Sequence, residues 1–238
     1  MTPLQLAVAA LAMMAGTLIQ GSIGFGTNLV AAPILAIINP DLVPVPVILA
    51  SLVFNVLVAR RDRGEGPWQL MRFPLLGSVP ASVAGAAAVA LVSQRGLGIL
   101  FGVLVLVGVA LSVSGRHPPQ TRGHLLVAGA ASGFMGTTTG IGGPPMALMF
   151  QRERGPQLRA SLARFFGVGS VVSFVLLLAF GQVAWADLGR AAVLIPGGLV
   201  GFWLSKYLAH RLDHGYVRHA VLAISATSAC IVLVRALL

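Results

Sequence analysis

Residues 16–28 read GTLIQGSIGFGTN, and residues 133–145 read GFMGTTTGIGGPP. Both stretches place several glycines and small polar residues inside long apolar runs. Glycine adopts backbone conformations that end a helix, so each stretch predicts a point where a helix stops and the chain turns back. We therefore expect two broken helices buried in apolar surroundings.

The two stretches are related by a constant offset. A shift of 116 residues places Gly24 on Gly140 and keeps the spacing of the glycine that follows each of them. Similar matches farther along need compensating gaps. The repetition predicts an internal duplication, with one half at residues 1–115 and the other at 122–238.

The composition excludes a soluble protein. Of 238 residues, 57% are hydrophobic and only 9% are charged, too few to cover a soluble surface. Residues 1–40 hold no Asp, Glu, Lys or Arg, and their start lacks the basic region of a cleaved signal peptide. A spanning helix needs ~20 mostly apolar residues. Further charge-free runs cover residues 42–59, 73–94, 96–115, 123–151, 165–186, 191–205 and 219–234. The chain is thus expected to be all-α, one polytopic transmembrane helical bundle over residues 1–238.

The basic residues predict how the chain is oriented. The net charge of +10 would suit nucleic-acid binding, but these residues lie in short segments between apolar runs. Such segments normally face the cytoplasm. Segments 60–72, 116–124, 152–164 and 206–218 are therefore expected inside, and both termini outside, in a multi-pass cell membrane protein, of the bacterial inner membrane. We expect the lipid bilayer as a partner and no nucleic acid.

The second Gly-rich stretch must return to the side from which it enters. Residues 123–151 join two basic segments and are too short for two full spans. They predict a re-entrant hairpin or a pair of short helices. Residues 44–59 run from outside to inside, whereas their counterpart at 160–180 runs outward. The halves are therefore expected to form an inverted repeat, each with a Gly-rich hairpin followed by three spanning helices, as in secondary transporters.

The candidate binding residues are the glycines, hydroxyls and amides of the two stretches. A short helix after each break would present free N–H groups and a positive dipole end, which together favour an anion. The alternative is that the glycines permit close helix packing and the hydroxyls bond their own backbone. The candidates are Gln20, Gly21, Ser22, Gly24, Gly26, Thr27, Asn28, Thr137, Thr138, Thr139, Gly140, Gly142 and Gly143.

Two further polar residues lie within predicted spans. Asn55 follows Ser51 by four residues, so the two share a helix face, where Asn55 either faces the transport pathway or bonds a neighbouring helix. Arg164 either attracts anions or extends to the headgroups. The sequence shows no Cys/His metal cluster, nucleotide-binding loop or carboxylate within a span. We therefore expect no metal, no cofactor and no catalytic residue.

The paired Gly-rich motifs, each opening a half, resemble the sulfite exporter TauE/SafE family of membrane transporters. The Ala-Ser-Leu segments at 50–52 and 160–162 and the tryptophans Trp68 and Trp185 fit the same family. The resemblance covers nearly the whole chain. It implies export or exchange of small sulfur-containing anions such as sulfite, sulfonates or sulfoacetate.

The sequence can be compared with the needs of three classes of function. A secondary exporter or exchanger of small anions agrees with the duplicated breaks and with the resemblance. An intramembrane enzyme acting on an anionic or lipid-linked substrate would need ionisable groups within the spans. An accessory subunit without transport activity would not need duplicated re-entrant motifs. We expect a transporter, not an enzyme, with a small anion as its substrate. The sequence leaves open whether the chain forms a homo-oligomer.

Overall fold

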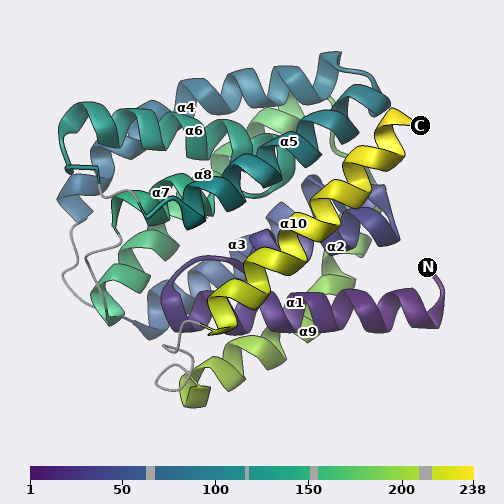
Figure 1. The fold of residues 1–238 in the computed structure, drawn as a ribbon, viewed down its shortest axis with the longest axis horizontal. Helices are drawn as coiled ribbons and strands as arrows, with labels where there is room; N and C mark the ends of the chain where they lie inside the picture. The colour runs from purple at the N-terminus through teal and green to yellow at the C-terminus, as the bar shows by residue number, and fades with distance from the viewer. Residues whose placement is uncertain (63–67, 116–117, 151–154, 209–215) are drawn as a thin grey trace.

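The computed structural model describes residues 1–62, 68–115, 118–150, 155–208 and 216–238, and the side chains of these except at 68–70, 208 and 216–221. Over this part of the chain it holds ten α-helices, one 3-10 turn and no strand (Figure 1). Several basic residues used to predict the orientation lie outside the described residues: Arg63, Arg116, His117, Arg152, Arg154 and Arg211. The side chains of Trp68 and Arg218 are also outside the described part. The elements are α1 (Pro3–Ile23), α2 (Thr27–Ile38), η1 (Pro40–Leu42), α3 (Val45–Arg61), α4 (Trp68–Leu91), α5 (Gln94–Val113), α6 (Arg122–Thr139), α7 (Gly143–Met149), α8 (Pro156–Ala179), α9 (Trp185–Leu208) and α10 (Tyr216–Leu237).

The expected all-α bundle is confirmed for the described residues. Six segments of the described chain are long and apolar enough to cross a membrane. They are Pro3–Ile23, Pro40–Arg61, Met71–Leu91, Gln94–Val113, Pro156–Ala179 and Trp185–Tyr207. Large apolar side chains such as Leu76, Val127 and Trp203 are exposed on the outside of the bundle, as a lipid-facing surface requires.

The bundle has two distinct ends, and both termini lie at the same one (Figure 1). We call this the terminal end; contacts there join Arg95 to the carbonyl of Leu237 and Arg235 to the carbonyl of Ile37. We call the opposite end the basic end, because α3, α5 and α9 finish there and α4, α6 and α8 begin there. The basic residues described at this end are Arg60, Arg61, Arg72, Arg122, Arg159 and Lys206.

Each Gly-rich stretch forms a hairpin with one long and one short arm. Helix α1 has 21 residues and is followed by the 12-residue α2, whereas α6 has 18 residues and α7 only 7. For residues 123–151 the chain thus follows the hairpin alternative, and a pair of short helices does not describe it, because α6 has 18 residues. Both long arms end at a glycine in the left-handed region, Gly24 at φ 96° and Gly140 at φ 77°. The left-handed conformation ends each helix, and a side chain would be strained there, which explains why glycine occupies both positions.

Several glycines of α6 and α9 permit close packing against neighbouring helices. A Cβ on Gly129 or Gly133 of α6 would lie 2.0 Å or 2.3 Å from a carbonyl oxygen of α4. Helices α9 and α1 make the same kind of contact, because a Cβ on Gly197 or Gly201 would lie 2.3 Å or 2.1 Å from a carbonyl oxygen of α1. Small residues at such crossings let helix backbones approach within a membrane. Gly197 and Gly201 therefore allow α9 to pack closely against α1.

A substitution pair on α9 tests this packing. We expect Gly197→Ala to lower the melting temperature of the purified protein by several degrees, because the new methyl group would overlap Ala10 of α1 and overpacking costs about 1–3 kcal/mol. Gly189 on the same helix has open space around its Cβ position, so Gly189→Ala should leave the melting temperature unchanged or slightly raised. Equal melting temperatures for the two variants would contradict the proposed helix contact.

Candidate functional site

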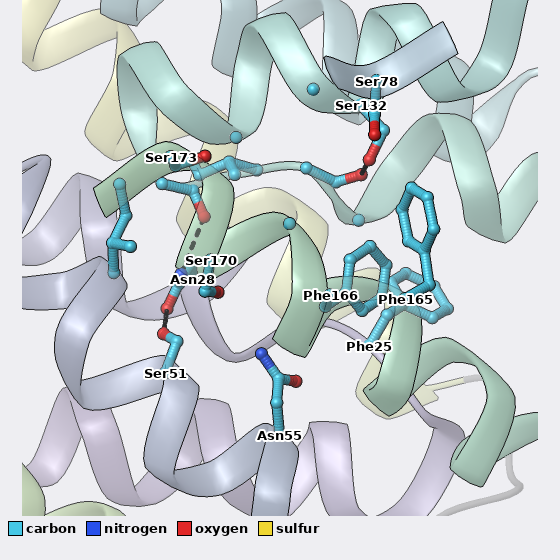
Figure 2. Close-up of a pocket in the computed structure, with 18 of the residues that line it drawn as sticks. Phe25, Asn28, Ser51, Asn55, Ser78, Ser132, Phe165, Phe166, Ser170 and Ser173 are labelled. Atoms are coloured by element: carbon cyan, nitrogen blue, oxygen red, sulfur yellow. Dashed lines mark hydrogen bonds between the residues drawn. The ribbon is translucent and has the colours of Figure 1, made fainter. Parts of the chain in front are cut away.

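One cavity of about 70 Å³ lies between the two helix breaks (Figure 2). Its walls come from both hairpins and from helices α3, α4 and α8. Its lining combines glycine backbone, hydroxyl and amide side chains, and a phenylalanine wall. The polar side chains are Gln20, Asn28, Ser51, Asn55, Ser78, Ser82, Ser132, Ser170 and Ser173.

Asn28 joins the two breaks directly. It lies in the first turn of α2, and its Nδ2 donates a 2.7 Å hydrogen bond to the carbonyl oxygen of Gly140, where α6 ends. Ser51 Oγ lies 2.7 Å from Asn28 Oδ1 and also 2.7 Å from the Val47 carbonyl, so its single proton has two acceptors (Figure 2). Residues 112 positions apart in the sequence thus form one hydrogen-bonded wall.

Gln20 and Asn55 form a second buried amide pair. Gln20 Nε2 donates to Asn55 Oδ1 at 2.6 Å, and the two side chains are 5% and 3% exposed. Asn55 Nδ2 has no hydrogen-bond partner among the described residues, and the same holds for the hydroxyls of Ser82 and Ser170. Three polar groups of the cavity wall therefore remain available to a ligand.

The two short helices contribute unequally to the site. Helix α2 begins after Gly26, which has no side chain to cap it, and its first intrahelical bond runs from the Val30 amide to the Gly26 carbonyl. The preceding amides of α2 therefore point out of its N-terminus without an intrahelical partner. Helix α7 begins Gly143-Pro144-Pro145, and proline has no N–H to offer. The donors at a helix start are thus concentrated at the first break.

The cavity contains half of the residues expected from the sequence. Those that line it are Gln20, Gly26, Asn28, Asn55, Gly140, Gly142 and Gly143. Those that do not are Gly21, Ser22, Gly24, Thr27, Thr137, Thr138 and Thr139. Arg164, half-buried on α8, also lies outside the lining.

Hydrogen bonds to nearby groups account for most of the hydroxyls outside the cavity. Thr138 donates to the carbonyl of Phe134, and Thr139 to that of Met135, each four residues earlier in α6. Thr137 Oγ1 lies 2.7 Å from Ser173 Oγ and thereby supports the cavity wall from behind. Thr27 Oγ1 is buried without a partner in the described chain. The alternative that hydroxyls bond their own backbone therefore holds for Thr138 and Thr139.

Sequence reasoning missed the serines of α4, α6 and α8 and the phenylalanine wall. Ser78 and Ser82 are four residues apart on α4, and Ser170 and Ser173 are three apart on α8, so each pair shares a helix face. This spacing within charge-free runs is the signal that identifies them. The phenylalanines carry no such signal, because aromatic residues occur throughout apolar helices. They are Phe25, Phe165 and Phe166 (Figure 2).

No charged side chain of the described residues lines the cavity. A ligand there would meet neutral donors and the positive end of α2. Uncapped helix amides and neutral hydrogen-bond donors stabilise an anion in a region of low dielectric. The arrangement can therefore hold a small anion without a buried cation. Within the part of the chain that the structure describes, no group of His, Cys, Asp and Glu is placed to bind a metal.

Comparison with known proteins gives two matches. The family model described as "Sulfite exporter TauE/SafE" matches residues 8–232. A protein of Cupriavidus necator, described as "Probable sulfite/organosulfonate exporter TauE", is 25% identical over 206 residues, which cover 81% of this chain and 79% of the relative. No solved structure matches the chain.

Proposed function

Because the chain belongs to the sulfite exporter TauE/SafE family and is a membrane transporter of anions, we propose that the cavity between the two helix breaks binds its substrate. The substrate proposed is one small sulfur-containing anion, such as sulfite or a short organosulfonate. The relative is described as a sulfite/organosulfonate exporter, which supports this class of ligand. The main support for this proposal is the position of Asn28. It lies in the first turn of α2, and its Nδ2 donates a hydrogen bond to the carbonyl of Gly140 at the second break.

The size and polarity of the cavity support a ligand of few atoms. A buried water needs at least about 10–15 Å³ on this scale, so a cavity of about 70 Å³ accommodates a group the size of a sulfur oxyanion. The partner-free groups Asn55 Nδ2, Ser82 Oγ and Ser170 Oγ can donate to its oxygens. The phenylalanine wall suits the apolar part of an organosulfonate.

The arrangement of helices supports an inverted repeat. Helix α1 of the first half packs along α9 of the second, and α6 of the second half packs along α4 of the first. Helices in equivalent positions also contact one another, α3 with α8 and α5 with α10. Each contact thus has a counterpart when the halves exchange roles. Rocking of such halves around a central site is the usual basis of alternating access.

Export of an anion needs no additional energy source. With the cell interior negative, outward movement of one negative charge gains ~2.3 kcal/mol per 100 mV of membrane potential. An intramembrane enzyme is less well supported, because the lining residues offer no ionisable group for acid–base catalysis.

Transport by the purified protein in vesicles tests the proposed function. Vesicles loaded with sulfite should release it when the protein is present, and short sulfonates should compete. Monocarboxylates of similar size should compete weakly. Equal transport of sulfur oxyanions and carboxylates, or none of either, would contradict the proposal.

The proposed orientation places the basic end in the cytoplasm and both termini outside, in a bacterial inner membrane. The chain has one cysteine, Cys230, so Cys230→Ser gives a cysteine-free background. Thr2→Cys at the terminal end should react with an impermeant thiol reagent added to intact cells. Gly123→Cys at the basic end should react only after the membrane is opened. The reverse pattern of labelling would contradict the orientation.

A further inference from the structure

A buried charged cluster lies at the basic end, outside the cavity lining. Asp62, which is 7% exposed, accepts hydrogen bonds from Arg61 Nε and Nη2 at 3.0 Å each and from Arg159 Nε at 2.7 Å. Asp62 follows the last residue of α3, and Arg159 lies in the first turn of α8. The Arg61–Asp62–Arg159 cluster therefore joins α3 to α8.

The same arginines reach two further helices. Arg61 Nη2 donates to the Gly21 carbonyl at 2.5 Å, and its Nη1 donates to Ser205 Oγ of α9 at 2.7 Å. Its guanidinium also lies 5.1 Å from the centre of the Phe202 ring. Arg159 Nη1 donates to the carbonyl of Ser22 at 3.5 Å. Helices α1, α3, α8 and α9 thus meet at one set of charges.

The cluster lies directly next to the first break. Gly21 follows Gln20, which lines the cavity, and a Cβ on Gly24 would lie 3.2 Å from Arg159 Cα. The carbonyls that the arginines bond belong to the last turn of α1, the negative end of its dipole. The cluster therefore lies beside the first break, at the end of α1 that faces the basic end of the bundle.

The charges hold together in their buried position. Burial raises the pKa of Asp62. The hydrogen bonds and positive charges of Arg61 and Arg159 lower it by more than burial raises it, so the pKa lies below the ordinary value. The carboxylate therefore stays ionised at neutral pH. Removal of one partner from a buried ion pair is strongly destabilising, because it leaves the other charge buried without compensation. Hydration of the charges would remove the cost of keeping them out of water, so entry of water would favour separation of the cluster.

We propose that the Arg61–Asp62–Arg159 cluster is the gate that closes the cavity toward the basic end. The gate opens when α8 moves away from α3 and Arg159 leaves Asp62. The proposal rests on the proposed function, since a gate presupposes a cavity that opens to each side in turn. A second ion-paired group, Arg190 with Asp41 and Asp187, lies at the terminal end and supplies a matched control.

Chemical access to the cavity tests the gate without any measurement of transport. Ser170→Cys in the Cys230→Ser background places a reporter thiol in the cavity wall. The protein is placed in vesicles with a known orientation, with the basic end outside in one set and the terminal end outside in the other. An impermeant, positively charged thiol reagent is then added to the outside of each set. We expect Asp62→Asn to raise the labelling rate at least tenfold from the basic side and not from the terminal side. Asp187→Asn, the control, should leave the rate from the basic side unchanged.

Two results would overturn the gate: an unchanged rate in Asp62→Asn, or an equal increase from both sides. If Asp62→Asn does not enter the membrane, Arg159→Gln is measured instead. This variant keeps the Arg61–Asp62 pair and releases only α8. The same increase is expected, and an unchanged rate overturns the proposal. Failure of the parent protein to transport sulfur anions would overturn the proposed function, whereas normal transport with unchanged labelling would overturn the gate alone.

Discussion

Asn28→Asp is expected to abolish anion transport while the protein still folds and enters the membrane. The substitution places a negative charge beside the proposed anion and sets a carboxylate oxygen against the Gly140 carbonyl, which now accepts from Asn28 Nδ2. Two unit charges 4 Å apart repel by about 4 kcal/mol at an effective dielectric constant of 20, which corresponds to about a thousandfold in affinity. An acidic residue in the first turn of α2 favours the helix itself, so folding should be retained.

Asn39→Asp is the matched control. Asn39 lies at the terminal end, where its side chain accepts from the backbone of Asp41, and an aspartate can accept the same bond. Transport in vesicles should be near normal in this variant and absent in Asn28→Asp. Normal affinity and rate in Asn28→Asp would remove Asn28 from the binding site.

Gly140→Val is expected to have the second large effect, a loss of transport of at least tenfold. A Cβ on Gly140 would lie 2.8 Å from Val47 Cγ1 and 3.6 Å from Asn28 Nδ2, so the new side chain would push α3 and the bonded amide apart. The residue also has a φ of 77°, where a branched side chain is strained. Strain alone would lower stability without identifying a site.

Gly181→Val separates strain from the effect on the cavity. Gly181 has a φ of 70°, and nothing lies within 4 Å of its Cβ position. Both variants should lose stability in thermal unfolding, Gly140→Val the more because of its overlap with Val47, but only Gly140→Val should lose transport per folded molecule. Equal transport in the two would show that Gly140 matters for the backbone alone.

The duplicated glycine stretches predicted where the cavity of the proposed site lies, but not the lengths of the helices around it. Gly16, Gly21, Gly24 and Gly26 look equivalent in the sequence, yet α1 continues through the first two and ends only at Gly24. Gly16 serves packing, since a Cβ there would lie 2.4 Å from the carbonyl oxygen of Thr27. Whether a glycine breaks a helix or lets another backbone approach depends on its neighbours in space, which a single sequence does not specify.

The polar residues divide in a similar way. Gln20, Asn28 and Asn55 were candidates because they are polar side chains within apolar runs, and all three line the cavity. The threonines of α6 were selected by the same reasoning, but Thr138 and Thr139 bond their own helix. Ser82 and Ser170 were not among the candidates, although they line the cavity. A hydroxyl in a helix can bond the preceding turn or face a cavity with equal ease, and only the fold distinguishes the two.

The most direct test of the central claim is the position of the bound anion. A crystal structure of the protein with selenite, in which selenium replaces the sulfur of sulfite, would locate the anion by anomalous scattering. We expect one selenium peak in the cavity, within hydrogen-bond reach of the α2 N-terminus and Asn55. A selenium peak at Arg61 and Arg159 with none in the cavity would contradict the account.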